Sequence, residues 1–526
     1  MITKVFSACP YGIEARLVTV EVDMRRKGIP AFALVGLPDA SIREAKERVI
    51  SSIRNCGISF PAAKVTVNLA PAHFKKEGPE LDLPIACGIL GSDGQIAAER
   101  AADIFRDYIF IGELGLDGTL RRVRGALALA LAAKKEGFRG IVTPEGNKEE
   151  AALVEGLEVI PCQRLQDVIS WVNGHAAIEP YRLSADFWRS FLDGAGSEGG
   201  IDFADILGNT LAKKALEIAA AGAHHVLLIG PPGVGKTLLA KAYAGLFPPL
   251  DQNECLELTK IYSVAAPLEG PWPLVAHRPF RSPHHTASDV SIVGGGAQAL
   301  PGEVSLAHHG ILFLDEMAEF DRRVLEVLRQ PMEEGDVSVS RAAGKFRYPA
   351  RFSLIAATNP CPCGWMGSRE RECQCSTGQI LRYRRKFSGP ILDRIDIHAQ
   401  VSAQEFREAV GGAGPKSAAE PTAEIRRRVL AARERQSKRF GASNGRKTRL
   451  NAHMGLQDLR AYCKMGKEEE DFLREVMKRQ GLSPRAYHRI LKVARTAADL
   501  TGREAISLED ISLAVKMRSL DRAVSY

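Results

Sequence analysis

The feature that most constrains this chain is a glycine-rich loop between a short apolar run and a helical run. The apolar run is Val226–Ile229, the loop reads Gly230-Pro-Pro-Gly-Val-Gly-Lys-Thr237, and residues 238–244 follow with a helical pattern. Glycines let backbone N–H groups curl around a phosphate, and the start of the following helix adds a favourable dipole. Strand, loop and helix in this order predict an α/β domain with a phosphate-binding loop.

Two side chains at the end of this loop carry further chemistry. Lys236 can reach the β- and γ-phosphates of a nucleotide, and the Thr237 hydroxyl can bind Mg²⁺. The predicted nucleotide-binding set is Gly230, Pro231, Pro232, Gly233, Val234, Gly235, Lys236 and Thr237.

A second apolar run, 310–314, ends in Asp315 and Glu316. A parallel strand beside the loop strand would place Asp315 near Mg²⁺ and leave Glu316 free to polarise an attacking water. An ordinary surface pair is the alternative, but its place after a phosphate-binding loop favours catalysis. A third run, 352–358, is followed by Asn359, whose amide could orient that water.

Two arginines lie farther along the chain. Arg394 follows Ile391-Leu-Asp in an apolar, strand-like context, and Arg485 follows Ser483-Pro at the start of a helical segment. Each could form a structural salt bridge, but a polyanionic transition state can use both.

In this order, these motifs resemble those of AAA+ ATPases. Residues 301–316, Pro-Gly-Glu-Val-Ser-Leu-Ala-His-His-Gly-Ile-Leu-Phe-Leu-Asp-Glu, are similar to the clade shared by magnesium-chelatase ATPase subunits and minichromosome-maintenance helicases. Over essentially all 526 residues, the chain resembles the YifB/ComM family, the competence-associated magnesium-chelatase-like ATPases. The resemblance implies ATP and Mg²⁺ as cofactors and a homo-oligomeric ring, expected to be a hexamer. It also implies Arg394 as arginine finger, Asn359 as sensor 1 and Arg485 as sensor 2.

Two glycine-rich stretches, 193–200 and 411–421, divide the chain. We expect an N-terminal α/β domain at 1–190, a linker at 191–200, an AAA+ α/β core at 201–403 with a Cys-rich insertion at 361–375, a linker at 404–421, and a helical lid at 422–526. Helical periodicity predicts helices at 41–55 and 125–137, and at 423–438, 456–463, 467–480, 483–500 and 507–516 in the tail. Short β-rich runs are expected at 17–22, 64–68, 108–112 and 141–143.

The N-terminal third resembles a Lon-type protease domain, a ribosomal S5-like fold, through residues 112–125 and the Ala-rich helix after them. A Lon protease needs a Ser activated by a deprotonated Lys. Glu80 stands after Gly78-Pro79, where the Ser is expected, and Leu127 stands at the Lys position. We therefore expect a Lon-like fold without the dyad, used for DNA binding or assembly.

Four cysteines within 15 residues form the patterns Cys361-Pro-Cys363 and Cys373-Gln-Cys375. Four thiolates suit tetrahedral zinc, although the C-x₂-C spacing is commoner than C-x-C. Free thiols, a redox-labile pair and iron–sulfur ligation are the alternatives. Polar residues between the pairs predict an exposed knuckle, and His277, His284 and His285 lack partners at metal-ligand spacing.

Charge indicates what such a motor acts on. Residues 421–526 contain 24 Lys and Arg against 13 Asp and Glu, a net charge of +11, and Arg382-Tyr-Arg-Arg-Lys386 adds a basic-aromatic cluster. Residues 337–348 read as a β-hairpin whose Arg341, Lys345 and Arg347 could track DNA phosphates, although a solvated hairpin is the alternative. The expected partner is single-stranded, forked or branched DNA, moved by a helicase or branch-migration activity in recombination and natural transformation. A chelatase-type ATPase that remodels a protein is the second candidate, disfavoured because its ATPase subunit is expected to lack the N-terminal third.

Composition and targeting signals point to a cytoplasmic protein without a membrane partner. Hydrophobic residues make up 45% and charged residues 25% of the chain, as in globular proteins. The longest uninterrupted apolar stretch, 126–133, is far shorter than the roughly 20 residues that span a bilayer. The N-terminus lacks the apolar segment of a signal peptide.

Overall fold

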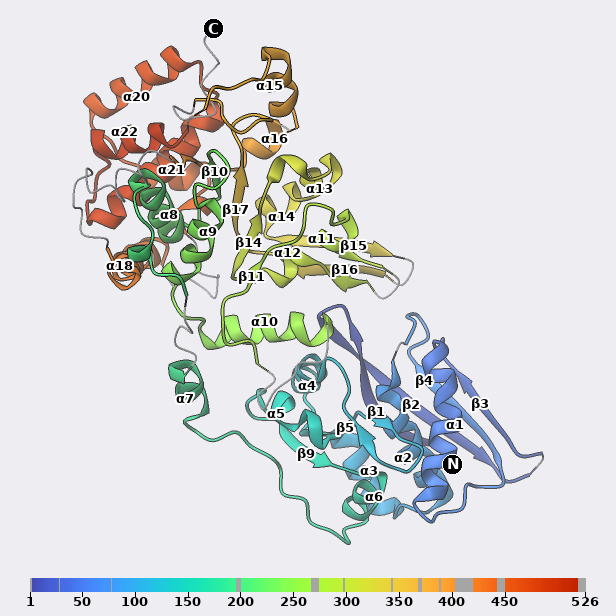
Figure 1. The fold of residues 1–526 in the computed structure, drawn as a ribbon. Helices are drawn as coiled ribbons and strands as arrows, with labels where there is room; N and C mark the ends of the chain where they lie inside the picture. The colour runs from blue at the N-terminus through green and yellow to red at the C-terminus, as the bar shows by residue number, and fades with distance from the viewer. Residues whose placement is uncertain are drawn as a thin grey trace.

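Two sheets organise the chain, one in the N-terminal unit and one in the central unit (Figure 1). The computed structural model describes residues 2–27, 29–76, 78–194, 200–265, 274–296, 299–341, 344–367, 371–386, 389–402, 420–441 and 450–518.

The N-terminal sheet has seven strands in the order β3-β4-β2-β1-β5-β8-β9. Its strands are β1 (Ile2–Tyr11), β2 (Glu14–Arg25), β3 (Ala31–Val35), β4 (Lys64–Ala70), β5 (Tyr108–Phe110), β8 (Gly140–Pro144) and β9 (Glu158–Cys162). The pairs β1–β2 and β2–β4 are antiparallel and the others parallel. Two short strands, β6 (Glu113–Leu114) and β7 (Leu120–Arg121), pair separately.

Helices cover both faces of this sheet because its strands alternate buried side chains between two cores. Val5 and Cys9 of β1 belong to the core beneath one set of helices, and Ala8 belongs to the core on the other face. The first set is α1 (Ala40–Asn55), α2 (Asp82–Asp93), α3 (Ala98–Asp107) and α6 (Leu165–Val172). The second is α4 (Ala126–Lys135) and α5 (Lys148–Ala152), with α7 (Phe187–Gly194) after the last strand.

The central sheet has five parallel strands in the order β11-β14-β17-β10-β18. They are β10 (Val226–Ile229), β11 (Phe280–Arg281), β14 (Ile311–Leu314), β17 (Ser353–Thr358) and β18 (Ile397–Gln400). The strand of the glycine-rich loop, β10, lies beside β17, and β14 lies on the far side of β17. Parallel strands expose their carboxyl ends at one edge, so the predicted motifs after β10, β14 and β17 meet there.

Helices also cover both faces of the central sheet. One face carries α8 (Thr210–Gly222) and α9 (Lys236–Tyr243). The other elements of this unit are α10 (Gln252–Ala265), α11 (Asp289–Val293), α12 (Glu303–Leu306), α13 (Arg322–Val327), α14 (Arg329–Glu334), α15 (Thr377–Arg384), α16 (Gly389–Leu392), β12 (Gly294–Gly295) and β13 (Leu300–Pro301). The buried strand residues alternate, with Val226 and Leu228 facing α8 and Leu227 facing the opposite core.

The C-terminal helices complete the face of the sheet that α8 covers. They are α18 (Thr422–Phe440), α19 (Leu456–Tyr462), α20 (Lys467–Gln480), α21 (Pro484–Thr501) and α22 (Leu508–Lys516). Their buried side chains, such as Val429 and Ile490, share one core with Leu216 of α8 and Val226 of β10. The helical group is therefore packed onto the central unit by apolar burial rather than held by a linker alone.

A β-hairpin extends from the central unit where the sequence predicts one. Strands β15 (Asp336–Arg341) and β16 (Gly344–Pro349) pair antiparallel, with Val339 opposite Phe346 and Ser340 opposite Lys345. Val339 and Phe346 are buried, while Ser340 and Lys345 are exposed. The hairpin thus has one packed face and one open face.

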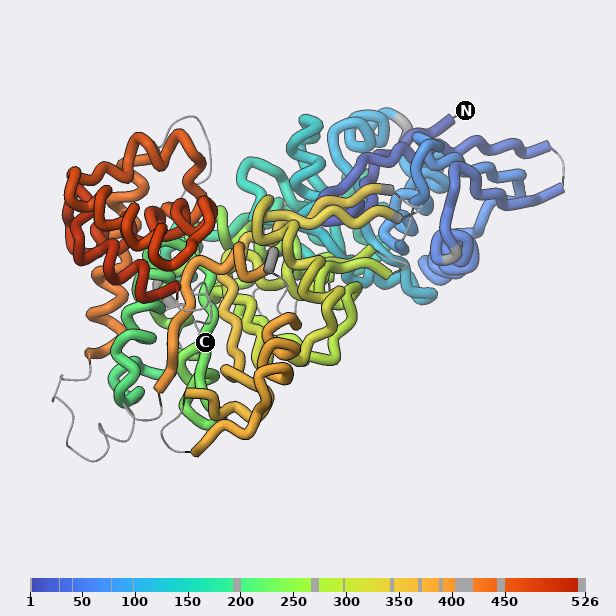
Figure 2. The backbone as a smooth tube through the Cα atoms, turned by 90° about the horizontal axis from the view of Figure 1, so that it is seen from above, coloured from blue at the N-terminus to red at the C-terminus, as the bar shows by residue number. Residues whose placement is uncertain are grey.

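Several contacts join the N-terminal and central units, and Figure 1 shows α10 lying between them. The Gly125 amide, at the start of α4, donates to Ser263 Oγ of α10 at 3.0 Å. The rings of Tyr11 at the end of β1 and Phe346 of the hairpin lie 4.7 Å apart. Figure 2 shows the hairpin reaching toward the N-terminal unit.

The secondary-structure predictions are confirmed for both predicted N-terminal helices, for the five tail helices and for the four β-rich runs, with ends shifted by a few residues. No helix among the described residues is both long enough and apolar enough to cross a bilayer. The predicted linkers fall largely on residues outside the described ones, and the domain limits stay predictions.

Candidate nucleotide-binding site

The glycine-rich loop follows β10 directly and leads into α9. The Gly230 amide donates to the Thr358 carbonyl at 3.2 Å, which ties the start of the loop to the end of β17. Gly233 and Gly235 have φ of +79° and +87°, a backbone region that disfavours L side chains. These two glycines turn the chain so that Lys236 opens α9.

Lys236 points into the loop that it ends. Its ammonium donates to the carbonyls of Gly230 and Pro231 at 2.7 and 2.8 Å and to Asn359 Oδ1 at 3.1 Å. Partial burial lowers the pKa of Lys236 to about 8, although the Asp315 and Glu316 carboxylates favour the charged form. A phosphate that replaced the two carbonyls would find a cation already placed among the loop atoms.

The residues predicted to hold Mg²⁺ lie together. Thr237 Oγ1 donates to Asp315 Oδ2 at 2.9 Å, so the first turn of α9 meets the end of β14. A hydroxyl and a carboxylate are hard oxygen donors of the kind that Mg²⁺ prefers, and few protein ligands suffice when phosphates and waters complete the octahedron. The donor set therefore fits a nucleotide-bound Mg²⁺.

Glu316 adopts a left-handed backbone conformation, with φ of +50°, immediately after Asp315. Its amide donates to Asp315 Oδ1 at 3.0 Å, and 62% of its side chain is exposed. His285 Nδ1 lies 3.9 Å from Glu316 Oε2. The sequence gives His285 no partner at metal-ligand spacing, and nothing local pairs it with a residue 31 positions later.

Asn359 is the third polar group at this edge of the sheet. It follows β17, and its amide oxygen accepts from Lys236. The preceding Thr358 Oγ1 lies 3.2 Å from the Tyr383 hydroxyl of α15. The structure thus brings Lys236, Thr237, Asp315, Glu316 and Asn359 together at the carboxyl ends of three neighbouring strands.

Arg394 lies in a turn after α16, not in the strand-like context that the sequence predicts. The apolar neighbours Ile391 and Ile395 are buried side chains that flank the turn. Arg394 forms an ion pair with Glu333 of α14, and its side chain is 11% exposed. It is held within its own subunit in this structure.

Arg485 contacts the residue that precedes Arg394. It lies in the first turn of α21, where Nη1 donates to Asp393 Oδ2 at 3.2 Å. One helical turn farther, Arg489 Nη1 donates to Asp396 Oδ1 at 2.6 Å. Helix α21 therefore forms ion pairs with the segment around Arg394 on both sides of that arginine, at Asp393 and at Asp396.

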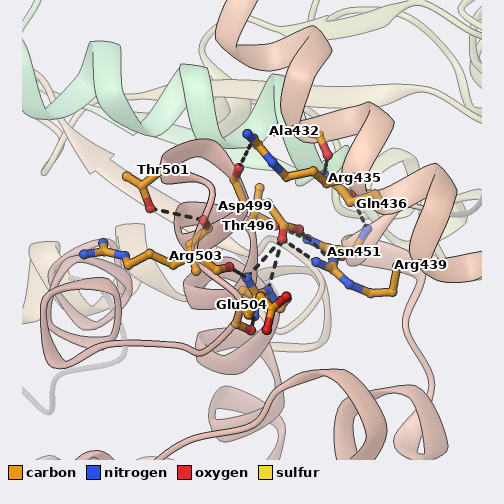
Figure 3. A network of polar contacts seen from close by, with 12 residues as sticks. Ala432, Arg435, Gln436, Arg439, Asn451, Thr496, Asp499, Thr501, Arg503 and Glu504 are labelled. Atoms are coloured by element: carbon orange, nitrogen blue, oxygen red, sulfur yellow. Dashed lines mark hydrogen bonds and ion pairs between the residues drawn. The ribbon is translucent and has the colours of Figure 1, made fainter.

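A buried polar network extends from Asp396 into the C-terminal helices. His224 lies between two of its members: its Nδ1 is 2.9 Å from Asp396 Oδ2 and its Nε2 is 2.8 Å from Thr496 Oγ1. Asn451 then donates to Thr496 Oγ1 at 3.0 Å and to Asp499 Oδ2 at 2.8 Å (Figure 3). Burial alone would raise the pKa of Asp396, but Arg489 and His224 outweigh it and hold that pKa well below its usual range.

The four sulfurs of the cysteine insertion converge. Cys361 Sγ lies 3.4 Å from Cys363 Sγ and 3.6 Å from Cys373 Sγ, and the Cys363 amide donates to Cys375 Sγ at 3.4 Å. All four sulfurs lie within 4.8 Å of one another. Zinc–sulfur bonds of about 2.3 Å in a tetrahedron place sulfurs about 3.8 Å apart, so the cluster has nearly that shape. Cys361 is buried and the other three are half-buried, so the expected exposed knuckle is wrong at its first cysteine.

A second group, Glu257, His308 and His309, lies close enough to suggest a metal but does not suit one. His308 Nδ1 accepts from the Arg351 amide at 3.0 Å, so neutral His308 carries its proton on Nε2. That N–H points at Glu257 Oε2, 3.1 Å away. These hydrogen bonds connect α10 to the residues that precede β14.

The predicted DNA contacts lie on the open face of the hairpin where the structure describes them. Lys345 is exposed, and Arg347 is 74% exposed although it forms an ion pair with Asp336. Arg341 ends β15, and its side chain lies outside the described atoms.

Glu80 and Leu127, at the expected protease positions, are both buried. Burial raises the pKa of Glu80 to about 8. Neither position offers the Ser or Lys that a Lon dyad requires.

Comparisons with known proteins show which protein family the chain resembles. The family model described as "Magnesium chelatase, subunit ChlI" matches residues 202–409, "Subunit ChlI of Mg-chelatase" matches 20–147, and "Magnesium chelatase, subunit ChlI C-terminal" matches 419–518. The uncharacterized protein YifB of Escherichia coli is 41% identical over 98% of this chain and 96% of its own length. Competence protein ComM of Haemophilus influenzae is 40% identical over 98% of this chain and 97% of its own length.

The chain belongs to the YifB/ComM family of magnesium-chelatase-like AAA+ proteins. Its likeness to chelatase subunits themselves is weaker: the magnesium-chelatase 38 kDa subunit of Rhodobacter capsulatus is 27% identical over 47% of this chain and 72% of its own length. One chelatase model nevertheless matches inside the N-terminal third.

Proposed function

We propose that this protein hydrolyses ATP at the edge of the central sheet. The observation that carries the proposal is the convergence of Lys236, Asp315 and Asn359 from three different strand ends. Residues 230–237 would hold the phosphates, and Thr237 and Asp315 would hold Mg²⁺. Glu316 would polarise the attacking water and Asn359 would orient it.

Two arginines would complete the ATP site. Arg394 would reach the site of a neighbouring subunit, and Arg485 would reach phosphate from the C-terminal helical lid. A neighbour's γ-phosphate would compete with Glu333 for Arg394, and a phosphate near the lid would compete with Asp393 for Arg485. An arginine finger can be supplied by another subunit, and the family resemblance implies that Arg394 acts on the ATP site of its neighbour in a ring. We therefore propose a homo-oligomeric ring, with a hexamer as the expected form.

DNA is the proposed substrate. The +11 charge of residues 421–526 and the open face of the hairpin offer sequence-independent phosphate contacts. A full-length relative carries the name competence protein, which supports a role in DNA recombination during natural transformation. The proposed activity on DNA is that of a helicase or a branch-migration enzyme.

A chelatase-type ATPase that remodels a protein partner remains the second candidate. It is favoured by the three chelatase subunit models, which together match most of the chain. The two candidates share the ATP site and differ in what stimulates it.

Two further assignments belong to the same proposal. Cys361, Cys363, Cys373 and Cys375 would hold one zinc ion per chain, because their sulfurs already approach tetrahedral spacing. The N-terminal unit would be a Lon-like fold without its dyad that serves DNA engagement or ring assembly.

The deciding experiment measures DNA affinity and ATPase rate on single-stranded, forked and four-way-junction DNA across salt concentrations. Replacing Arg341, Lys345 and Arg347 by alanine should make the log–log salt slope for single-stranded DNA shallower by about 2, since each neutralised phosphate contributes about 0.7. The control removes the same charge from three exposed cations of the central unit outside the hairpin, Lys241, Arg322 and Arg323. Equal slopes for both triple variants would remove the hairpin from the proposal.

A further inference from the structure

The cysteine insertion, residues 361–375, lies directly against the phosphate-binding loop. Gly364 is buried and has φ of +83°. A methyl group placed on Gly364 would come within 2.8 Å of Pro232 Cδ and 3.9 Å of Asn359 Cγ. The backbone of the insertion thus packs against Pro232 of the loop and lies near Asn359, the residue that accepts from Lys236.

The chain on either side of the insertion is tied to the end of β17. On the N-terminal side, Cys361 follows Asn359-Pro360 with no intervening residues, and its carbonyl accepts from the Gly364 amide at 2.9 Å. On the C-terminal side, Cys375 leads into α15, whose Tyr383 hydroxyl lies 3.2 Å from Thr358 Oγ1.

The four sulfurs lie where they could fasten the two ends of the insertion together, and Arg371 lies over the Trp365 ring, 5.8 Å from its centroid, as a weaker second contact. Cys361 and Cys373 come from opposite ends and lie 3.6 Å apart, beyond a disulfide bond but close to the separation of two thiolates on one zinc. The Met366 amide donates to Cys361 Sγ at 3.3 Å, which orients that sulfur toward the cluster. Without a metal, four thiols offer one another only weak hydrogen bonds.

We propose that the metal-loaded insertion is a positioning element of the nucleotide site. By holding Gly364 against Pro232 and beside Asn359, it fixes the outer wall of the loop and the amide that meets Lys236. Zinc would then control how tightly ATP binds without any cysteine touching the nucleotide. The inference rests on the proposed ATPase function and adds a metal-dependent positioning role to that site.

Two glycines of the insertion provide a matched pair for the test. Gly364 and Gly367 both have a left-handed backbone, with φ of +83° and +76°, so alanine strains both. A methyl group on Gly367 meets no atom of the described residues within 4 Å, whereas one on Gly364 meets Pro232. Only Gly364→Ala should push on the loop.

The measurements are zinc content, and KM and kcat for ATP, on the full chain. We expect Gly364→Ala to raise KM about tenfold, the effect of about 1.4 kcal/mol of local overpacking, while zinc stays near one per chain. Gly367→Ala should keep the wild-type KM and the same zinc content. Equal KM values for the two variants, or loss of zinc from Gly364→Ala, would overturn the inference.

Zinc removal gives a second readout that no substitution confounds. Treating the wild type with a zinc-selective chelator in excess Mg²⁺ should raise KM, and added zinc should restore it. The same treatment of Gly364→Ala should change KM less, because the contact is already disturbed. A wild type that hydrolyses ATP with an unchanged KM after losing zinc would refute only this inference. A wild type that neither binds nor hydrolyses ATP would refute the proposed function as well.

Discussion

Arg485 and Arg489 lie one helical turn apart on α21, and the structure predicts opposite consequences for their loss. Arg489 pairs with Asp396, whose side chain is 1% exposed, at 2.6 Å. Arg485 pairs with Asp393 at 3.2 Å, with side chains 73% and 42% exposed. Replacing each arginine by methionine keeps an unbranched apolar stem and removes the charge.

The expected magnitudes follow from burial. Removing Arg489 leaves a buried carboxylate with a hydrogen bond from His224 and the more distant charge of Lys492, and breaking a buried pair in this way costs about 3–5 kcal/mol of unfolding free energy. Removing Arg485 breaks an exposed pair worth about 0–1 kcal/mol. For ATP hydrolysis we expect a severe loss in Arg485→Met at wild-type stability, because this arginine is the proposed lid contact to phosphate.

Urea unfolding followed by circular dichroism, together with ATPase rates under conditions where each variant is folded, measures both effects. A pH series adds a signature of Asp396. Because its pKa is depressed in the folded state, the stabilisation is present above the unfolded value, about 3.9, and is lost as pH falls below it. Arg489→Met should weaken this acid dependence. Variants whose unfolding free energies agree within about 0.5 kcal/mol would refute the burial argument.

Three further outcomes are expected. Lys236→Ala should abolish ATP binding or turnover, whereas Glu316→Gln should bind ATP and fail to hydrolyse it. Nucleotide retention on a filter distinguishes the two variants. Wild-type turnover in both would contradict the assignment of the ATP site. Mixing Arg394→Ala with Glu316→Gln subunits should restore some ATPase activity, since some interfaces then hold both intact residues; a mixture that exchanges subunits yet stays inactive would contradict a finger acting across subunits. Burial lowers the pKa of His225 to about 4, so the unfolded chain takes up a proton first and stability should fall as pH drops from about 6.5 to about 4; a flat unfolding free energy over that window would show that His225 is not neutral in the folded chain.

The sequence was sufficient to predict the meeting of Lys236, Thr237, Asp315 and Asn359. Each follows an apolar run of strand length, and parallel strands bring such positions to one edge. The hairpin at 337–348 was equally accessible, because alternation of apolar and polar residues sets its register.

Contacts between distant segments could not be read in the same way. Nothing in the sequence pairs Arg394 with Glu333, Tyr11 with Phe346, or His285 with Glu316. These contacts depend on where whole elements dock, and docking leaves no periodic signal. The same limit explains why Cys361 was expected at the surface: the polar residues between the cysteine pairs say nothing about a sulfur that follows β17 into the core.

The central claim is that ATP hydrolysis in this chain moves DNA. Unwinding of a labelled four-way junction, with the wild type and Glu316→Gln side by side, tests it most directly. We predict ATP-dependent unwinding by the wild type, faster ATP hydrolysis when the junction is present, and binding without unwinding by Glu316→Gln. Absence of both unwinding and DNA-stimulated hydrolysis across salt and nucleotide conditions, in a protein that hydrolyses ATP, would contradict the claim and favour a protein remodeller.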